Sequence, residues 1–187
     1  MSESAALVSE VAGGSPVAVH RPSNLAELGE LVANRDGLTL VPVGGGTQLE
    51  LGNRPTNPFA LLDLSRALGD RMDHQKDDLT LVASAGCALE EVARLLGRHG
   101  QFIALDPPHP NRATVGGTLA AAMAGPLRSR FGPPRDAVLG MTVLRADGVL
   151  VKAGGRVVKN VTGYDLMRTW CGSLGTLGIL TEVALRV

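Results

Sequence analysis

The apolar positions of this chain fall either in short unbroken runs or in stripes with helical spacing. Runs at 38–43, 60–63 and 79–83 predict buried strands, because each is short and is bounded by polar residues or glycine. Stripes at 25–32 and 89–96 predict helices, and Asn24 and Glu27 have the capping-box spacing that begins the first helix. A helix followed by a strand and a glycine turn is typical of an α/β unit.

The second half of the chain has a different composition, and the change occurs near Asp106. It is predicted to begin with a short strand at 102–105, a rigid loop at 106–108 and a small-residue helix that opens at 113–118 and runs to 124. A hairpin of strands 138–145 and 149–153 around Asp147-Gly148 follows. The chain then has a short helix that ends near Gly172 and a last strand at 179–187. We find no internal repeat and no linker. The pattern therefore predicts two subdomains of α+β type, 1–105 and 106–187.

Composition excludes several classes of protein. Hydrophobic residues make up 44% and charged residues 19%, which argues against wholesale disorder. The formal net charge of zero and the aromatic content of 3% argue against a nucleic-acid partner. No apolar stretch is long enough to span a membrane, and the acidic start does not resemble a signal peptide, so we expect a cytoplasmic protein without direct membrane insertion.

Candidate metal sites are weak. Cys87 and Cys171 lie far apart and form no Cys/His cluster, so we predict neither an iron–sulfur site nor a zinc site, and read both as buried apolar side chains. The aspartates between Asp63 and Asp78 have the character of a solvated surface. His109 and the arginine-rich loop at 128–135 are open to more than one interpretation, either ligand contact or surface pairing.

Glycine is concentrated in three segments of the chain. Gly44-Gly45-Gly46 follows a predicted buried strand, where the absence of Cβ lets backbone amides approach an oxyanion, and Thr47 adds a hydroxyl. This suits a pyrophosphate. The spacing matches neither the Rossmann fingerprint nor the Walker loop, and a glycine turn without a ligand is the alternative.

The other two glycine clusters each have an ordinary explanation as well. At 113–117 a helix start offers free amides to an anion, and the small residues 120–125 leave room for a flat ring, but close helix–sheet packing would also require them. The cluster at 172–179 could be a simple turn. All three together indicate a cofactor site, because each glycine has a cost in unfolded-state entropy.

Four segments in order, 42–47, 113–117, 159–166 and 172–179, resemble the motifs of the FAD domain of the vanillyl-alcohol oxidase/p-cresol methylhydroxylase (PCMH-type) family. The resemblance runs from His20 to Val187, and within the family it is strongest to the smaller FAD-binding subunit of bacterial glycolate oxidase. It implies a PCMH-type fold with a small, mostly parallel sheet and a larger, mainly antiparallel sheet with helices.

The resemblance also implies which residues contact FAD. Lys159 and Tyr164 belong to the signature without an assigned role. The cofactor-binding residues that it implies are Pro42, Val43, Gly44, Gly45, Gly46, Thr47, Gln48 and Leu49 for the pyrophosphate, Pro107, Pro108 and Thr114 beside the flavin and its phosphate-bearing chain, Gly116, Gly117, Ala124 and Gly125 along the small-residue helix, Gly132 near the isoalloxazine edge, and Gly175, Gly178 and Ile179 on the adenine side.

Two departures from the family pattern change these expectations. Members that bond FAD covalently often carry His in the first glycine loop, where this chain has Thr47-Gln48, so we expect non-covalent FAD. Many relatives have Glu where this chain has Leu174, which removes a polar contact and predicts lower affinity.

By resemblance, the chain is the FAD component of a 2-hydroxy-acid oxidoreductase whose flavin takes a hydride from the α-carbon of glycolate or a similar acid. A cap domain that supplies substrate contacts and a base is expected to be absent, so we assign no catalytic residue and no metal. The expected partners are a second flavoprotein subunit and an iron–sulfur subunit, which could also bring the chain to a membrane. The alternatives are a non-catalytic assembly subunit with structural or vestigial FAD, and another PCMH-fold FAD oxidoreductase, such as the reductase of cell-wall precursor synthesis.

Overall fold

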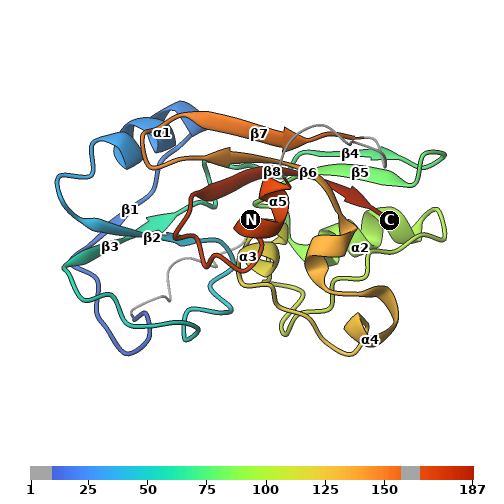
Figure 1. The fold of residues 1–187 in the computed structure, drawn as a ribbon, viewed down its shortest axis with the longest axis horizontal. Coiled ribbons are helices and arrows are strands. Elements are labelled where there is room, and N and C mark those ends of the chain that lie inside the picture. The colour runs from blue at the N-terminus through green and yellow to red at the C-terminus, as the bar shows by residue number, and fades with distance from the viewer. Residues whose placement is uncertain (1–9, 157–164) are drawn as a thin grey trace.

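The computed structural model describes residues 10–156 and 165–187, which form two sheets (Figure 1). The smaller sheet contains β1 (Ala18–His20), β2 (Thr39–Val43) and β3 (Phe59–Asp63), all parallel, in the order β1-β3-β2. The central strand β3 is buried throughout, as its apolar run predicts. The edge strand β2 is only half-buried, and Val43 is its one buried residue.

The larger sheet is antiparallel and takes strands from both halves of the chain. It consists of β4 (Met72–Gln75), β5 (Thr80–Ser84), β6 (Val138–Leu144), β7 (Leu150–Gly154) and β8 (Ile179–Arg186), in the order β4-β5-β8-β6-β7. The predicted α+β fold with one parallel and one antiparallel sheet is confirmed. The two sheets separate between β3 and β4, and the larger sheet takes strands from both sides of residue 105.

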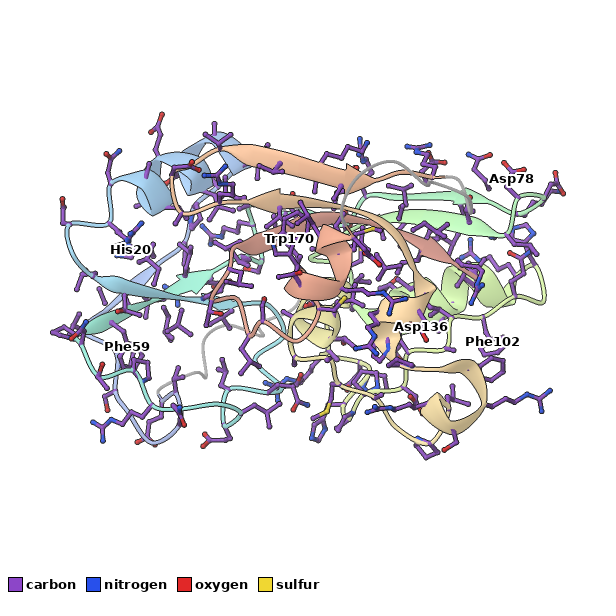
Figure 2. The ribbon with its side chains drawn as sticks, in the orientation of Figure 1. His20, Phe59, Asp78, Phe102, Asp136 and Trp170 are labelled. Atoms are coloured by element: carbon purple, nitrogen blue, oxygen red, sulfur yellow. The ribbon has the colours of Figure 1, made fainter. Side chains whose placement is uncertain are left out.

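The helices are short, and several lie against one side of the larger sheet (Figure 1). They are α1 (Leu25–Ala33), α2 (Leu89–Gly97), α3 (Val115–Ala120), α4 (Arg128–Phe131) and α5 (Leu166–Trp170), with a 3-10 helix at Pro134–Ala137. The main core joins Val92 of α2, Leu119 of α3 and Val183 of β8, all fully buried. Trp170 belongs to the same core and lies near the centre of the view in Figure 2. None of the helices in the described part of the chain has the length and apolarity that crossing a membrane requires.

The first helix begins where the sequence predicts. The side chain of Asn24 accepts a hydrogen bond from the amide of Glu27 at 3.0 Å. The returning bond of the capping box goes to a different residue, since Glu27 accepts from the amide of Ser23 at 2.7 Å. Leu28 and Val32 then pack into a second core with Leu144 and Ile179, which connects α1 to the larger sheet.

Three sequence predictions need correction. The apolar run 102–105 is not a strand: Ile103 and Leu105 are buried by packing into the main core, while Phe102 is exposed. The small-residue helix ends at Ala120 rather than near 124, because Ala122 adopts a left-handed backbone with φ of 48°. The sequence pattern predicted no strand before the first helix, whereas β1 forms at Ala18–His20. Of the motif 159–166, Lys159 and Tyr164 lie outside the described residues.

Candidate functional site

A large cavity lies where the two sheets meet. Its volume is about 1850 Å³, and its lining includes Pro42 and Val43 of β2, Leu144 of β6, and Ile179 and Leu180 of β8. The predicted site residues that line it are Pro42, Val43, Gly44, Gly45, Gly46, Thr47, Gln48, Leu49, Thr114, Gly116, Gly117, Gly175, Gly178 and Ile179. The structure therefore brings the three glycine clusters to one cavity although they are far apart in sequence.

The loop after β2 presents a run of unused hydrogen-bond donors. Among the described residues, the consecutive amides of 44–48 donate to no backbone or side-chain acceptor. The loop is largely half-buried, and a buried amide without a partner is costly. Adjacent amides that point into a concavity make an anion-binding nest. The loop geometry is therefore suited to a group rich in anionic oxygens.

Two of these glycines are also required by packing, which the sequence interpretation did not foresee. A Cβ on Gly44 would lie 2.5 Å from Oγ1 of Thr114, and a Cβ on Gly45 would lie 2.6 Å from the carbonyl carbon of Arg112. Gly46 has φ of 64°, a left-handed conformation that favours glycine. The three glycines thus let the loop turn tightly while it lies directly against residues 112–114.

The start of α3 does not offer the free amides that the sequence analysis predicted. The amide of Val115 donates to the carbonyl of Cys87 at 2.9 Å, and that of Gly116 donates to the carbonyl of Ala85 at 2.8 Å. The next amide, of Gly117, donates to Oγ1 of Thr114 at 3.2 Å. The close-packing alternative accounts for Gly116, since a Cβ there would lie 2.7 Å from that of Ala85. We conclude that α3 lines the cavity with small side chains but does not supply anion donors.

The third cluster forms another side of the same cavity. Gly175 has φ of 78°, and a Cβ on it would lie 2.7 Å from Cγ of Pro42. Gly178 has φ of 142°, and a Cβ on it would lie 2.6 Å from Cγ1 of Val143. The amide of Leu174 donates to the carbonyl of Ala120 at 2.8 Å. This turn therefore connects the ends of β2 and α3 with the start of β8.

Five predicted site residues lie outside the cavity lining: Pro107, Pro108, Ala124, Gly125 and Gly132. Gly125 lies against Asp106, whose carboxylate accepts from the amides of Gly125 at 2.8 Å and of Leu127 at 2.9 Å. Gly132 has φ of 85° and lies against Asp136. Sequence analysis missed Asp106 as an anchor, although an aspartate that begins a proline-rich loop is a common acceptor for backbone amides.

Several charged residues that the sequence analysis did not select also line the cavity: Arg35, Asp70, Glu90, Glu91 and Arg112. The guanidinium of Arg35 donates to the carbonyls of Val32 at 3.4 Å and Ala146 at 3.0 Å. The carboxylate of Glu91 accepts from Arg94 at 2.6 Å. Arg112 donates from Nη2 to the carbonyl of Gly45 at 3.3 Å. The signal that could have identified Arg112 was its position directly before the second glycine motif.

Thiol chemistry at this cavity is disfavoured. Cys87 is buried in its wall, and this burial, with the nearby charge of Asp70 adding to it, raises the pKa of its thiol to about 11. Burial likewise raises the pKa of Cys171 to about 11. Both thiols are therefore protonated near neutral pH, whereas nucleophiles and metal ligands are thiolates. Within 10–156 and 165–187, no three His, Cys, Asp or Glu side chains are grouped so as to hold a metal ion.

Comparison with known proteins gives a consistent result. A family model described as an FAD binding domain matches residues 16–154. The chain is 35% identical over 153 residues to glycolate oxidase subunit GlcE of Escherichia coli, covering 81% of this chain and 43% of that protein. It is 32% identical over 174 residues to glycolate oxidase subunit GlcD of Bacillus subtilis, covering 92% and 37%. A D-lactate dehydrogenase of Archaeoglobus fulgidus is 32% identical over 173 residues, covering 90% and 38%.

Solved structures show the same fold. An alkyldihydroxyacetonephosphate synthase superposes with a TM-score of 0.70 at 23% identity, covering 90% of this chain and 31% of that one. The chain spans less than half the length of the proteins that it matches.

Proposed function

This chain belongs to the FAD-binding domain family, and from that premise we propose that it holds non-covalent FAD for a 2-hydroxy-acid oxidase or dehydrogenase. FAD is the cofactor of the family. The observation that carries the proposal is the run of amides at 44–48, which have no acceptor in the described protein and line the cavity between the sheets.

The residues present fit FAD in size and chemistry. A diphosphate accepts from several donors at once, as the loop requires. The cavity exceeds the ~300–1,000 Å³ of ordinary small-molecule pockets, which suits a long dinucleotide. Thr47 and Gln48 occupy the positions where covalent attachment of FAD would need His. We therefore propose that the flavin is bound non-covalently and that acid denaturation releases it intact.

We assign the rest of the cofactor along the cavity. Gly175, Gly178 and Ile179 are proposed for the adenine side, and Thr114, Gly116 and Gly117 for the middle of the molecule. The flavin end is proposed to extend toward Pro107, Pro108, Ala124, Gly125 and Gly132, on the segments that Asp106 connects.

In the complete enzyme, the flavin is proposed to accept a hydride from the α-carbon of glycolate or a similar 2-hydroxy acid, giving the 2-oxo acid. The names of the glycolate oxidase and D-lactate dehydrogenase relatives support this substrate class. We assign no general base among the described residues, and propose that other parts of the assembly position the substrate and remove its proton. The proposed partners are a second flavoprotein subunit and an iron–sulfur subunit, and the proposed location is the cytoplasm or a membrane surface reached through those partners.

The test begins with the purified chain, FAD and a desalting step. Flavin absorption bands that stay with the protein, and that acid releases into the supernatant, support the proposed site. A colourless protein after incubation with FAD contradicts it. With the partner subunits present, bleaching of the flavin by glycolate, D-lactate or another 2-hydroxy acid supports the oxidoreductase role. A bound flavin that dithionite reduces but no hydroxy acid reduces would instead favour a structural cofactor in an assembly subunit.

A further inference from the structure

We infer that Arg112 supplies the full positive charge of the diphosphate site whose neutral donors are the amides of residues 44–48. The inference rests on the proposed function, since it assigns the countercharge of the same site. Neither the glycine motifs nor the family description identifies this residue. The inference is supported by the position of the Arg112 guanidinium relative to the loop at 44–48.

The backbone around Arg112 is fixed by a tight turn. The carbonyl of His109 accepts from the amides of Arg112 at 2.9 Å and Ala113 at 2.8 Å. His109 has a left-handed backbone with φ of 56°, which turns the chain back toward the glycine loop. The Arg112 backbone then lies so close to Gly45 that a Cβ on Gly45 would overlap the Arg112 carbonyl. This contact sets where the arginine side chain begins.

The side chain returns to the same loop. Nη2 of Arg112 donates to the carbonyl of Gly45 at 3.3 Å. A guanidinium has five N–H donors, so this bond leaves most of them available to oxygens held by the neighbouring amides. Its planar fork matches phosphate oxygens and keeps its charge at all working pH values.

The other charged groups of the cavity are less suited to this role. Arg35 is held by two carbonyls, and Glu91 is paired with Arg94. Arg112 has no carboxylate within ion-pair distance in the described part of the chain. The loop amides carry only partial charges, whereas a diphosphate carries full negative ones. A cation beside the loop therefore adds what the amides lack.

A purely structural role makes a different prediction. If Arg112 only holds its own segment against Gly45, its removal should weaken the binding of FAD by distorting the loop. The salt dependence of that binding should then equal that of the wild type. If it pairs with phosphate, its removal should also reduce the dependence of affinity on ionic strength, because one screened charge pair is lost.

The experiment measures dissociation constants of FAD and ADP at several salt concentrations for the wild type, Arg112→Gln, Arg112→Lys and the control Arg98→Gln. Arg98 is exposed, lies outside the cavity lining and has no ion pair in the described part of the chain, so its substitution removes the same charge without changing the cavity. We expect Arg112→Gln to weaken the binding of both ligands by about tenfold or more, with a shallower salt dependence. The affinity of Arg112→Lys should lie between those of Arg112→Gln and the wild type, and Arg98→Gln should match the wild type.

Two results would overturn the inference while leaving the proposed function intact. One is wild-type affinity in Arg112→Gln. The other is a weakened affinity whose salt dependence equals that of the wild type and that Arg112→Lys does not restore. A wild-type chain that binds neither FAD nor ADP would instead overturn the proposed function, and this inference with it.

Discussion

Gly45 and Arg112 contact each other in two ways. A Cβ on Gly45 would lie 2.6 Å from the carbonyl carbon of Arg112, and the guanidinium of Arg112 donates to the carbonyl of Gly45 at 3.3 Å. The first glycine motif is therefore packed directly against the segment that leads into the second one. The shape of the proposed diphosphate site depends on this packing as well as on the amides of residues 44–48, which have no acceptor among the described residues.

Substitution of Gly45 by alanine should be strongly destabilising. The new methyl group would overlap backbone atoms, which cannot move aside as a side-chain end can. We expect a loss of at least about 2 kcal/mol in the free energy of unfolding and loss of FAD binding. Thermal unfolding and FAD titration measure the two effects.

Gly97→Ala is the matched control. Gly97 is the last residue of α2, and a Cβ there would meet no atom within 4 Å. Alanine in a helix should leave stability unchanged or raise it by up to about 1 kcal/mol. Equal losses in Gly45→Ala and Gly97→Ala would show that the contact with Arg112 is not what requires glycine.

Asp106 should hold the segment at 125–127 through its two hydrogen bonds. In Asp106→Asn one oxygen is replaced by an NH₂ group, which cannot accept from a backbone amide. We expect the free energy of unfolding to fall by about 1–3 kcal/mol, because one amide loses its partner. Faster hydrogen exchange at the amides of Gly125 and Leu127 provides the local measurement. Asp77→Asn, at an exposed position, serves as the control, and a similar stability loss there would contradict the prediction.

The sequence predicts this fold well wherever local periodicity decides the structure. The cap at Asn24, the buried run of β3 and the hairpin of β6 and β7 all follow from residue spacing. The run 102–105 was wrongly predicted as a strand, because periodicity reports burial but not whether a neighbouring strand is available for pairing. Which strands share a sheet depends on long-range pairing, such as Thr80 opposite Arg186, and no local pattern contains that information.

The sequence indicated the segments that meet at the cavity but not which of their amides are free. All three glycine clusters do border one cavity. The sequence could not distinguish the free amides of 44–48 from those of α3, which are occupied by Cys87, Ala85 and Thr114. Distant carbonyls decide which amides are free, and they come close only in the folded chain.

We predict that Arg21 stabilises the buried carboxylate of Asp63. Its side chain is only 4% exposed, and its Oδ2 lies 3.2 Å from Nε of Arg21, while Oδ1 accepts from the amide of Ser65. Arg21→Ala removes the cation from a buried carboxylate, so we expect a loss of about 1–3 kcal/mol in the free energy of unfolding. Chemical denaturation measures it. Arg145→Ala removes an arginine from an exposed pair with Asp147 and should change stability by less than about 1 kcal/mol. Similar losses in both variants would contradict the role given to burial.

The raised pKa values of the two cysteine thiols predict that the folded chain loses stability in alkaline solution. The pKa of each thiol is raised to about 11 in the folded chain, chiefly by burial, whereas an exposed thiol has a pKa of roughly 8.5. The folded state therefore keeps protons that the unfolded state has released. This contribution to stability is complete below the unfolded pKa and is lost as the pH rises through the folded pKa.

We therefore expect the free energy of unfolding to fall between about pH 8.5 and pH 11, by at most ~1.4 kcal/mol per pH unit for each thiol. The double variant Cys87→Ala/Cys171→Ala will be less stable at pH 7 because it loses buried volume, but its stability should decline less steeply above pH 8.5. Urea titrations of both proteins across this pH range measure the difference. The comparison separates the contribution of the thiols from that of the lysines and the tyrosine, which ionise in the same pH range. Parallel curves for the two proteins would show that these thiols ionise as readily in the folded chain as in the unfolded one.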